Sequence, residues 1–212
     1  MLTIHAADLL VPGAGHEQVP VPGGAVAVDG DRIAALGPYE EVAAAYPHAR
    51  VRRWPGVLTP GLVRGDAAGF LEAAYHPDPR EADVLGTEPV TGEALTALGM
   101  TDARWGESAR RGVQRLLRSG VTAVVGPFTR PEVRTAVARS GLALLPGAPA
   151  EGAAPGAGFA GTLAVGARAD FAVFAVPAED AVPVSLTEAG AEAGARSCVA
   201  TVLGGRLLHR RR

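Results

Sequence analysis

The sequence contains no lysine, so all 20 of its basic residues are arginines. Without lysine the chain can form neither a Schiff base with a carbonyl substrate nor a carboxylated lysine bridge between metal ions. Its single cysteine, Cys198, has no partner for an internal disulfide. Because Cys198 stands in an apolar run, we expect it to be a buried strand residue rather than a nucleophile.

Charge of neither sign is in large excess, since 22 acidic residues stand against 20 basic ones and give a formal net charge of −2. No basic stripe runs along the chain, so a nucleic-acid partner is not expected. The sequence has no uncharged apolar run of about 18 residues, and its amino terminus lacks the basic and apolar regions of a signal peptide. We therefore expect no membrane partner and a cytoplasmic location.

Both ends of the chain have the pattern of β-structure. At the amino-terminal end, strands are predicted over 2–10, 25–28, 32–36 and 51–54. The turn Asp29-Gly30-Asp31 between two apolar runs predicts a hairpin, and a helix is expected over 39–46, ended by Pro47. At the carboxy-terminal end, strands are predicted over 162–165, 169–176, 198–203 and 206–209.

The middle of the chain alternates between helical and strand patterns. Helices are predicted over 101–119, with Thr101-Asp102 as the cap, and over 131–141, where Pro131 opens the helix and Gly141 ends it. The apolar runs 121–125 and 142–145 follow them. Short apolar strands separated by helices predict parallel pairing with right-handed crossovers. The proline- and glycine-rich residues 146–158 have the composition of a linker.

Three segments resemble the amidohydrolase superfamily, in the order that the superfamily has them. Residues 24–37 are similar to its amino-terminal hairpin, and Leu58 to Val63 to the entry into its barrel. Residues 161–174, with 202–207, are similar to the segment that returns to the β-domain. Within the superfamily the resemblance is to imidazolonepropionase-like and aminodeoxyfutalosine deaminase-like proteins. It implies hydrolysis of carbon–nitrogen bonds in rings or at ring amines, with zinc or iron as the cofactor.

The resemblance implies a mixed α+β fold in which both chain ends build one composite β-sandwich. The expected parts are a sandwich of residues 1–57 and 159–212, a truncated βα barrel insertion over 58–145, and a linker over 146–158. A complete barrel takes about 250 residues, whereas Pro60 to Gly158 supplies about a hundred, enough for roughly three parallel strands. Most of the barrel is therefore expected to be missing, together with the strands that would carry the later metal ligands.

An incomplete barrel leaves strand edges and apolar faces without their usual neighbours. We expect the runs 121–125 and 142–145 to be covered by the helices around Phe70 and Leu116 or by a second copy of the chain. A homodimer or another protein partner that covers the incomplete barrel is therefore predicted.

The metal motif of the superfamily has lost both of its histidines. Pro-Gly-Leu-Val/Ile-Asn/Asp is usually followed by His-x-His, and here those two positions are Asp66 and Ala68. An alanine methyl group offers no lone pair, and one carboxylate is a poor site for zinc or iron, which take three or four donors. We expect neither a metal nor another cofactor, and we expect Asp66 to cap a helix over 67–75.

The remaining polar motifs each have a functional and a structural interpretation. The densest cluster, residues 76–83, contains His76 and Asp78 and could bind a cation or a small polar ligand, although its two prolines are typical of a solvated loop. Residues 156–161 satisfy G-x-G-x-x-G but lack the flanking strand and helix that phosphate binding needs. The closing residues 209–212 could bind an acid, although a frayed terminus is favoured. His5, His16 and His48 show no spacing typical of a catalytic triad.

Two functional hypotheses follow. The first is a degenerate, metal-free imidazolonepropionase-like protein with a binding, scaffold or regulatory role and a possible small-molecule ligand. The alternative is an active hydrolase or deaminase of non-peptide carbon–nitrogen bonds in a cyclic or purine-like substrate, completed by a partner subunit. Its weak catalytic candidates are Asp66, His76 and Asp78. A structural partner of a biosynthetic enzyme is a third interpretation.

Overall fold

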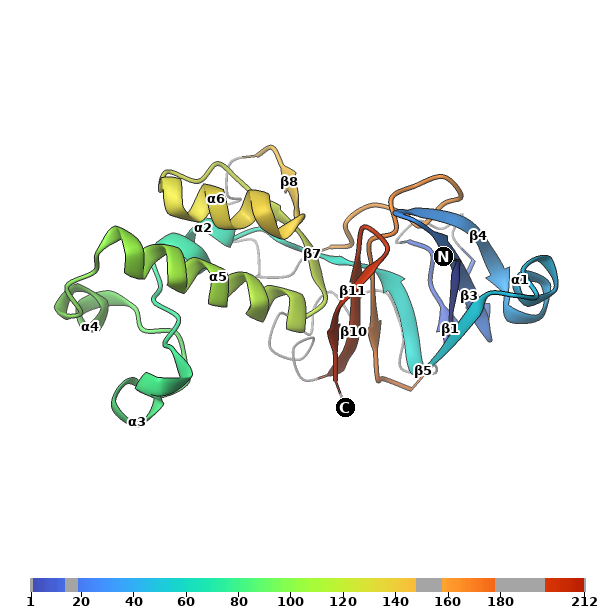
Figure 1. Cartoon of the computed structure of the whole chain (residues 1–212), viewed down its shortest axis with the longest axis horizontal. Coiled ribbons are helices and arrows are strands. Elements are labelled where there is room, and N and C mark those ends of the chain that lie inside the picture. Colours follow the sequence, from blue (N-terminus) through green and yellow to red (C-terminus); the bar gives the residue numbers. More distant parts are fainter. Residues whose placement is uncertain (1, 14–18, 148–157, 178–196, 212) are drawn as a thin grey trace.

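A computed structural model describes residues 2–13, 19–147, 158–177 and 197–211 (Figure 1). The strands are β1 (Thr3–Leu10), β2 (Val21–Pro22), β3 (Gly24–Asp29), β4 (Arg32–Pro38), β5 (Arg50–Pro60), β6 (Leu62–Arg64), β7 (Val121–Val125), β8 (Ala143–Leu145), β9 (Phe171–Phe174), β10 (Cys198–Leu203) and β11 (Arg206–Arg210). The helices are α1 (Tyr39–Ala45), α2 (Ala67–Glu72), the 3-10 turn η1 (Pro79–Glu81), α3 (Ala82–Leu85), α4 (Gly92–Ala97), α5 (Asp102–Arg118) and α6 (Pro131–Ser140). No helix in these ranges is long and apolar enough to cross a membrane.

The two ends of the chain come together as predicted, in one large mixed sheet; the finer prediction of a composite β-sandwich stays a prediction. The order of the strands in this sheet is β11-β10-β9-β5-β1-β3-β4, with β2 paired to β1. Strand β1 lies antiparallel to β3 and parallel to β5, and β5 in turn pairs antiparallel with β9. The amino-terminal strands therefore reach the carboxy-terminal ones through β5, which is longer than the predicted strand over 51–54 and runs on to Pro60.

The large sheet is a single curled sheet, and its curl closes against the segment that precedes β9. The backbone N–H of Ile33 in β4 donates to the carbonyl of Ala167 at 2.9 Å, and the N–H of Ala169 donates to the carbonyl of Asp31 at 2.8 Å. The curl encloses a core to which most of its strands contribute; it includes Val26, Leu58, Phe171 and Val202. Closure of this kind removes one exposed sheet edge.

The prediction of a strand over 162–165 is wrong. The N–H of Leu163 donates to the carbonyl of Pro12 at 2.7 Å, and residues 164–167 form a turn, so this segment has no neighbouring strand to pair with. The strand predicted over 169–176 is shorter in the structure, where β9 covers four residues. Residues 162–165 are apolar enough for a strand, but the N–H of Leu163 donates to a loop residue, Pro12, rather than to a strand.

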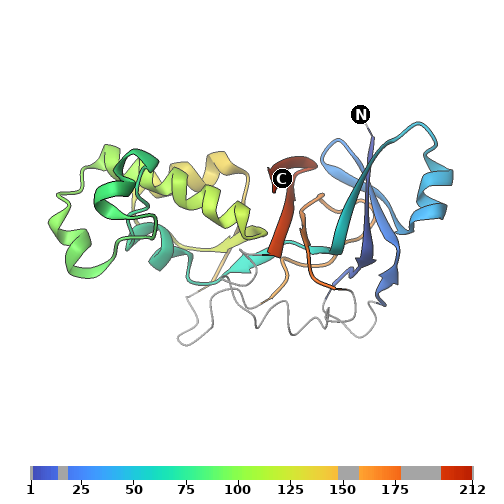
Figure 2. The same ribbon diagram turned by 90° about the horizontal axis from the view of Figure 1, so that it is seen from below.

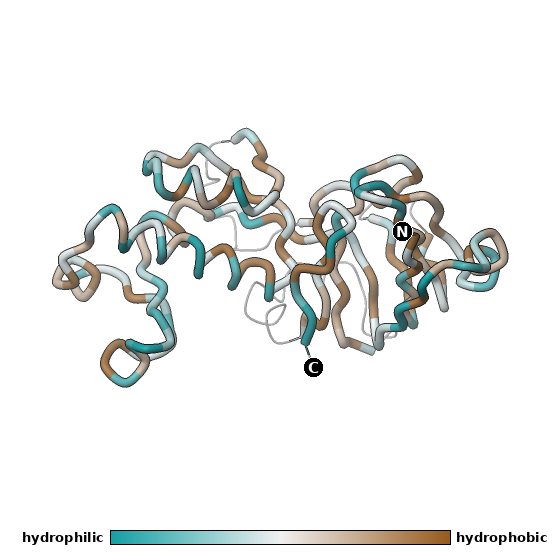
Figure 3. Tube along the Cα trace, in the orientation of Figure 1, coloured by the Kyte–Doolittle hydropathy of each residue, from teal (hydrophilic) through white to brown (hydrophobic). Residues whose placement is uncertain are grey.

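The middle of the chain forms a second, three-stranded parallel sheet of order β6-β7-β8. Helices α2, α5 and α6 cover it, and Figure 3 shows apolar residues where α5 approaches the strands. The long helix α5 begins at Thr101, whose hydroxyl accepts a hydrogen bond from the N–H of Arg104 at 3.3 Å. Its apolar face, which includes Val113 and Leu116, is buried against β7. The predicted cover of residues 121–125 is thus supplied by helices of the same chain.

The two sheets share one apolar core where α5 meets β10. Phe174 and Leu203 of the large sheet belong to the same buried cluster as Val121 and Leu116. The buried hydroxyl of Thr201 donates to the α5 carbonyl of Leu117 at 2.6 Å. Figure 2 shows β10 and β11 between the helical part and the rest of the large sheet. The domain boundaries expected from the sequence stay a prediction.

The outer edge of β6 is covered, whereas β8 is more open. The N–H of Ala160 donates to the carbonyl of Gly61 at 2.7 Å, and Phe159 forms a bridge with Leu62, so residues 158–160 lie along β6. On the opposite side of the small sheet, Leu144 of β8 is 57% exposed. Residues 148–157, most of the predicted linker, lie outside the part of the chain that the structure describes.

Candidate functional site

The Pro60-Gly61 element joins the two sheets, and its glycine has a packing role. A Cβ atom at Gly61 would lie 2.0 Å from the hydroxyl oxygen of Thr122 in β7, which is far closer than van der Waals contact. Gly61 therefore lets the chain leave β5 and enter β6 directly beside β7. This close approach explains the glycine of the Pro-Gly pair without any metal chemistry.

Asp66 stands where the resemblance implies the first histidine of the metal motif, and it caps a helix as predicted. Its Oδ1 accepts a hydrogen bond from the N–H of Gly69 at 3.1 Å at the start of α2. At the second position, Ala68 is partly buried and packs against the apolar core that the two sheets share. Within the described ranges, no group of three histidine, cysteine, aspartate or glutamate side chains could hold a metal ion. This donor set does not fit zinc or iron, which need three or four ligands.

His76 is a core residue rather than a residue of an open site. Its side chain is fully buried, and its Nε2 lies 2.8 Å from the carbonyl oxygen of Phe70, while Nδ1 has no hydrogen-bond partner. The close packing is visible at Gly112 of α5, where a Cβ would lie 2.8 Å from the imidazole ring. Burial lowers the pKa of His76 to about 4, so the ring is neutral near pH 7.

Asp78 belongs to a polar network that fastens the loop 75–81 to α5. Its Oδ1 caps η1 by accepting a hydrogen bond from the N–H of Arg80 at 3.0 Å. Its Oδ2 lies 3.4 Å from Nη1 of Arg111. The hydroxyl of Tyr75 donates to Glu81 at 2.5 Å. This hydrogen bond from Tyr75 is the main reason why the pKa of Glu81 lies below its usual value. Each carboxylate is thus already bonded within the protein.

Arginines of α5 complete this network, and they were not among the candidate residues predicted from the sequence. Arg104 donates to Glu81 at 3.0 Å, and Arg111 donates to the carbonyl of His76 at 2.7 Å. Arg115 donates to the carbonyl of Thr87. The three arginines recur at helical spacing, at positions 104, 111 and 115, so a polar stripe on the predicted helix was a usable signal.

The other sequence candidates do not come together into a catalytic group. Cys198 is buried, and burial raises the pKa of its thiol to about 11, as for an inert thiol. His5 is buried in the large sheet, where its Nδ1 accepts a hydrogen bond from Trp54, and burial lowers its pKa to about 3. His16, Gly156 and Arg212 lie outside the described residues.

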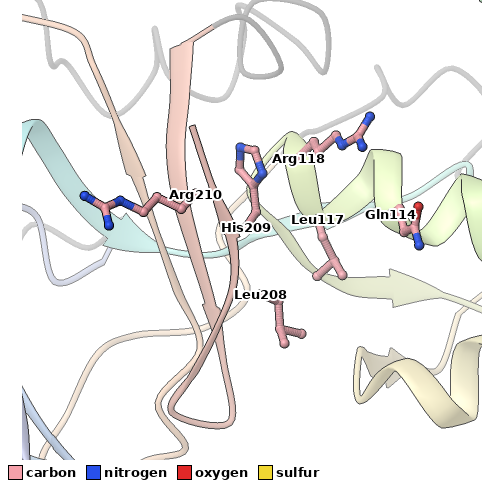
Figure 4. A pocket seen from close by; sticks show the side chains of 6 residues that line it. All are labelled: Gln114, Leu117, Arg118, Leu208, His209 and Arg210. Atoms are coloured by element: carbon pink, nitrogen blue, oxygen red, sulfur yellow. The ribbon is translucent and has the colours of Figure 1, made fainter. Parts of the chain in front are cut away.

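The carboxy-terminal residues are more ordered than a frayed terminus. Residues 206–210 form β11, and a pocket of about 370 Å³ lies between this strand and α5 (Figure 4). Its lining consists of Gln114, Leu117, Arg118, Leu208, His209 and Arg210. In Figure 4 the guanidinium groups of Arg118 and Arg210 point to opposite sides of His209, so they do not converge on one ligand in this pocket.

Comparison with known protein families gives a match for part of the large sheet. Residues 24–49 match the family model described as imidazolonepropionase-like composite domain, bacteria. This match covers β3, β4 and α1 and confirms the resemblance of this segment to imidazolonepropionase-like proteins. No curated protein sequence matches the chain.

Several solved structures are similar over 68–69% of the chain. They include ochratoxinase from A. niger, with 22% identity, a TM-score of 0.47 and 31% of its own chain covered. Aminofutalosine deaminase from Helicobacter pylori has 19% identity, a TM-score of 0.44 and 33% coverage. Guanine deaminase from E. coli has 14% identity, a TM-score of 0.46 and 36% coverage. The chain thus spans about a third of the length of these proteins.

Proposed function

We propose that this chain is a metal-independent, imidazolonepropionase-like protein that acts by binding a ligand or a protein partner and does not hydrolyse a carbon–nitrogen bond. The observation that carries the proposal is the hydrogen bond from the N–H of Gly69 to the Asp66 carboxylate. The carboxylate at the first ligand position is engaged in capping α2, and the second position is an alanine. Two further carboxylate candidates nearby in sequence, Asp78 and Glu81, are bonded to arginines.

Substitution of Asp66 separates a capping role from a ligand role. Asparagine accepts the same backbone hydrogen bond, so Asp66→Asn should keep the free energy of unfolding nearly unchanged, whereas Asp66→Ala should lower it by about 1 kcal/mol. Urea unfolding followed by circular dichroism measures both values. A metal-ligand role predicts instead that both variants change metal content.

The metal and the activity are measured on the same untagged protein. After incubation with excess zinc or iron and desalting, we expect substoichiometric metal by mass spectrometry in the parent chain and in both Asp66 variants. We also expect no hydrolysis of cyclic amidines, lactams or aminopurines. A stoichiometric metal together with a hydrolysis that Asp66→Ala and His76→Ala abolish would overturn the proposal in favour of the hydrolase or deaminase alternative.

We also propose that a protein partner covers β8, and that this partner is a second copy of the chain. Among the strands that the structure describes, β8 pairs only with β7, and Leu144 is 57% exposed. Such an edge favours association with another chain. Light scattering should show a dimer that Leu144→Glu converts to a monomer, while Val84→Glu, at an even more exposed apolar residue of α3, should not. A parent chain that stays monomeric at every concentration contradicts this part of the proposal.

A further inference from the structure

One face of β5 carries two arginines next to a tryptophan. Because side chains alternate along a strand, Arg50, Arg52 and Trp54 lie on the same face of the large sheet. The register of β1 with β5 places His5 beside Arg52, and Nε1 of Trp54 donates to Nδ1 of His5 at 3.2 Å. This face therefore has two arginines at one end of β5, next to the buried, hydrogen-bonded pair of His5 and Trp54.

Arg210 of β11 brings another guanidinium group to the same face. In the order of the sheet β11 lies three strands from β5, but the curl of the sheet places the Arg210 guanidinium 5.8 Å from the ring centroid of Trp54. In Figure 4 the Arg210 side chain points away from Arg118. We call Arg50, Arg52 and Arg210 the arginine cluster.

The arginine cluster has no acidic counterpart in the part of the chain that the structure describes. None of its three members takes part in an ion pair there. The Nε of Arg52 is buried without a hydrogen-bond partner, which carries a free-energy cost. Burial, followed by the charges of Arg50 and Arg210, lowers the pKa of Arg52, as expected for guanidinium groups that repel one another.

We propose that the arginine cluster binds the phosphate group of a small molecule, with Trp54 forming one wall of the site. A multiply charged phosphate offers several acceptor oxygens to planar guanidinium groups, and it would relieve both the repulsion and the unpaired Nε of Arg52. Three arginines on one face of the sheet match a multiply charged phosphate better than a carboxylate, which carries a single charge. The site lies on the large sheet, so it exists whether or not the part of the chain around the small sheet hydrolyses a substrate.

The fluorescence emission of Trp54 can be used to measure binding at this site. The chain has two tryptophans, so a Trp105→Phe background leaves Trp54 as the only tryptophan emission. The full chain is titrated with inorganic pyrophosphate, and in a second arm with inorganic phosphate, at an ionic strength held constant with sodium chloride. We expect a saturable change in Trp54 emission. Arg52→Gln and Arg210→Gln should each weaken binding by roughly tenfold or more, because each removes charge-assisted hydrogen bonds.

Two further variants make the test specific. Arg139→Gln removes one exposed positive charge from α6, far from the cluster in sequence, and should leave the affinity unchanged. Arg52→Lys keeps the charge but not the planar fork, so it should bind with intermediate affinity and decides the test if Arg52→Gln does not fold. The proposal is overturned if the signal does not saturate, if sodium acetate reproduces it, or if folded Arg52 variants bind as the parent does.

Discussion

The buried imidazole of His76 should make the stability of this protein fall steeply in mild acid. In the unfolded chain a histidine takes up a proton as the pH falls through about 6.5. In the folded protein the ring stays neutral until the pH approaches its pKa of about 4. The unfolded state therefore binds more protons between these two values, and the contribution of His76 to stability is present above pH 6.5 and is lost as the pH falls toward 4.

The size of the effect follows from the gap between the two pKa values. Each pH unit in this window corresponds to about 1.4 kcal/mol for one histidine, so His76 alone should account for roughly 3 kcal/mol between pH 6.5 and pH 4. The ring is fully buried, so solvent screening reduces this value little. His5, with a pKa of about 3, should add a loss of the same sign.

Urea unfolding at several pH values between 7 and 4 measures the slope. The parent chain is compared with His76→Gln, which removes the titrating group but keeps a hydrogen-bond donor, and with His48→Gln, which changes an exposed histidine. His76→Gln should be less stable at pH 7 and should lose much less stability toward pH 4. Equal slopes for the parent chain and His76→Gln would refute the assignment of His76 as a buried neutral ring.

Two further predictions concern the junction of the sheets. Gly61→Ala should lower the free energy of unfolding by about 3 kcal/mol through overpacking, whereas Gly65→Ala, where a Cβ meets no atom within 4 Å, should change it little; thermal unfolding of both would test this. Thr201→Val should cost about 1 kcal/mol because the Leu117 carbonyl loses the buried hydroxyl donor and keeps the N–H of Gly120 at 3.2 Å. The exposed Thr135→Val is its control, and equal losses for the two threonines would contradict the assigned role.

Local signals in the sequence were sufficient for much of the fold and for part of the candidate site. Asp29-Gly30-Asp31 predicted the hairpin between β3 and β4, and Thr101 predicted the start of α5. Both signals depend on backbone conformations and hydrogen bonds between residues close in sequence. The capping role of Asp66 was predictable for the same reason. The strand predicted over 162–165 failed because a strand also needs a neighbour, which its own residues do not specify.

The sequence by itself determined that Asp66 and Ala68 stand where the resemblance implies the two histidines of a metal motif. Side-chain chemistry of this kind can be read without the fold. Only the tertiary structure decided which distant groups meet. Residue 61 must be a glycine because the side chain of Thr122 leaves no room for a Cβ atom. Arg210 comes close to Trp54 only because the large sheet curls. Contacts of this kind depend on strand order, register and curvature, which arise from the packing of the whole chain rather than from any local stretch of it.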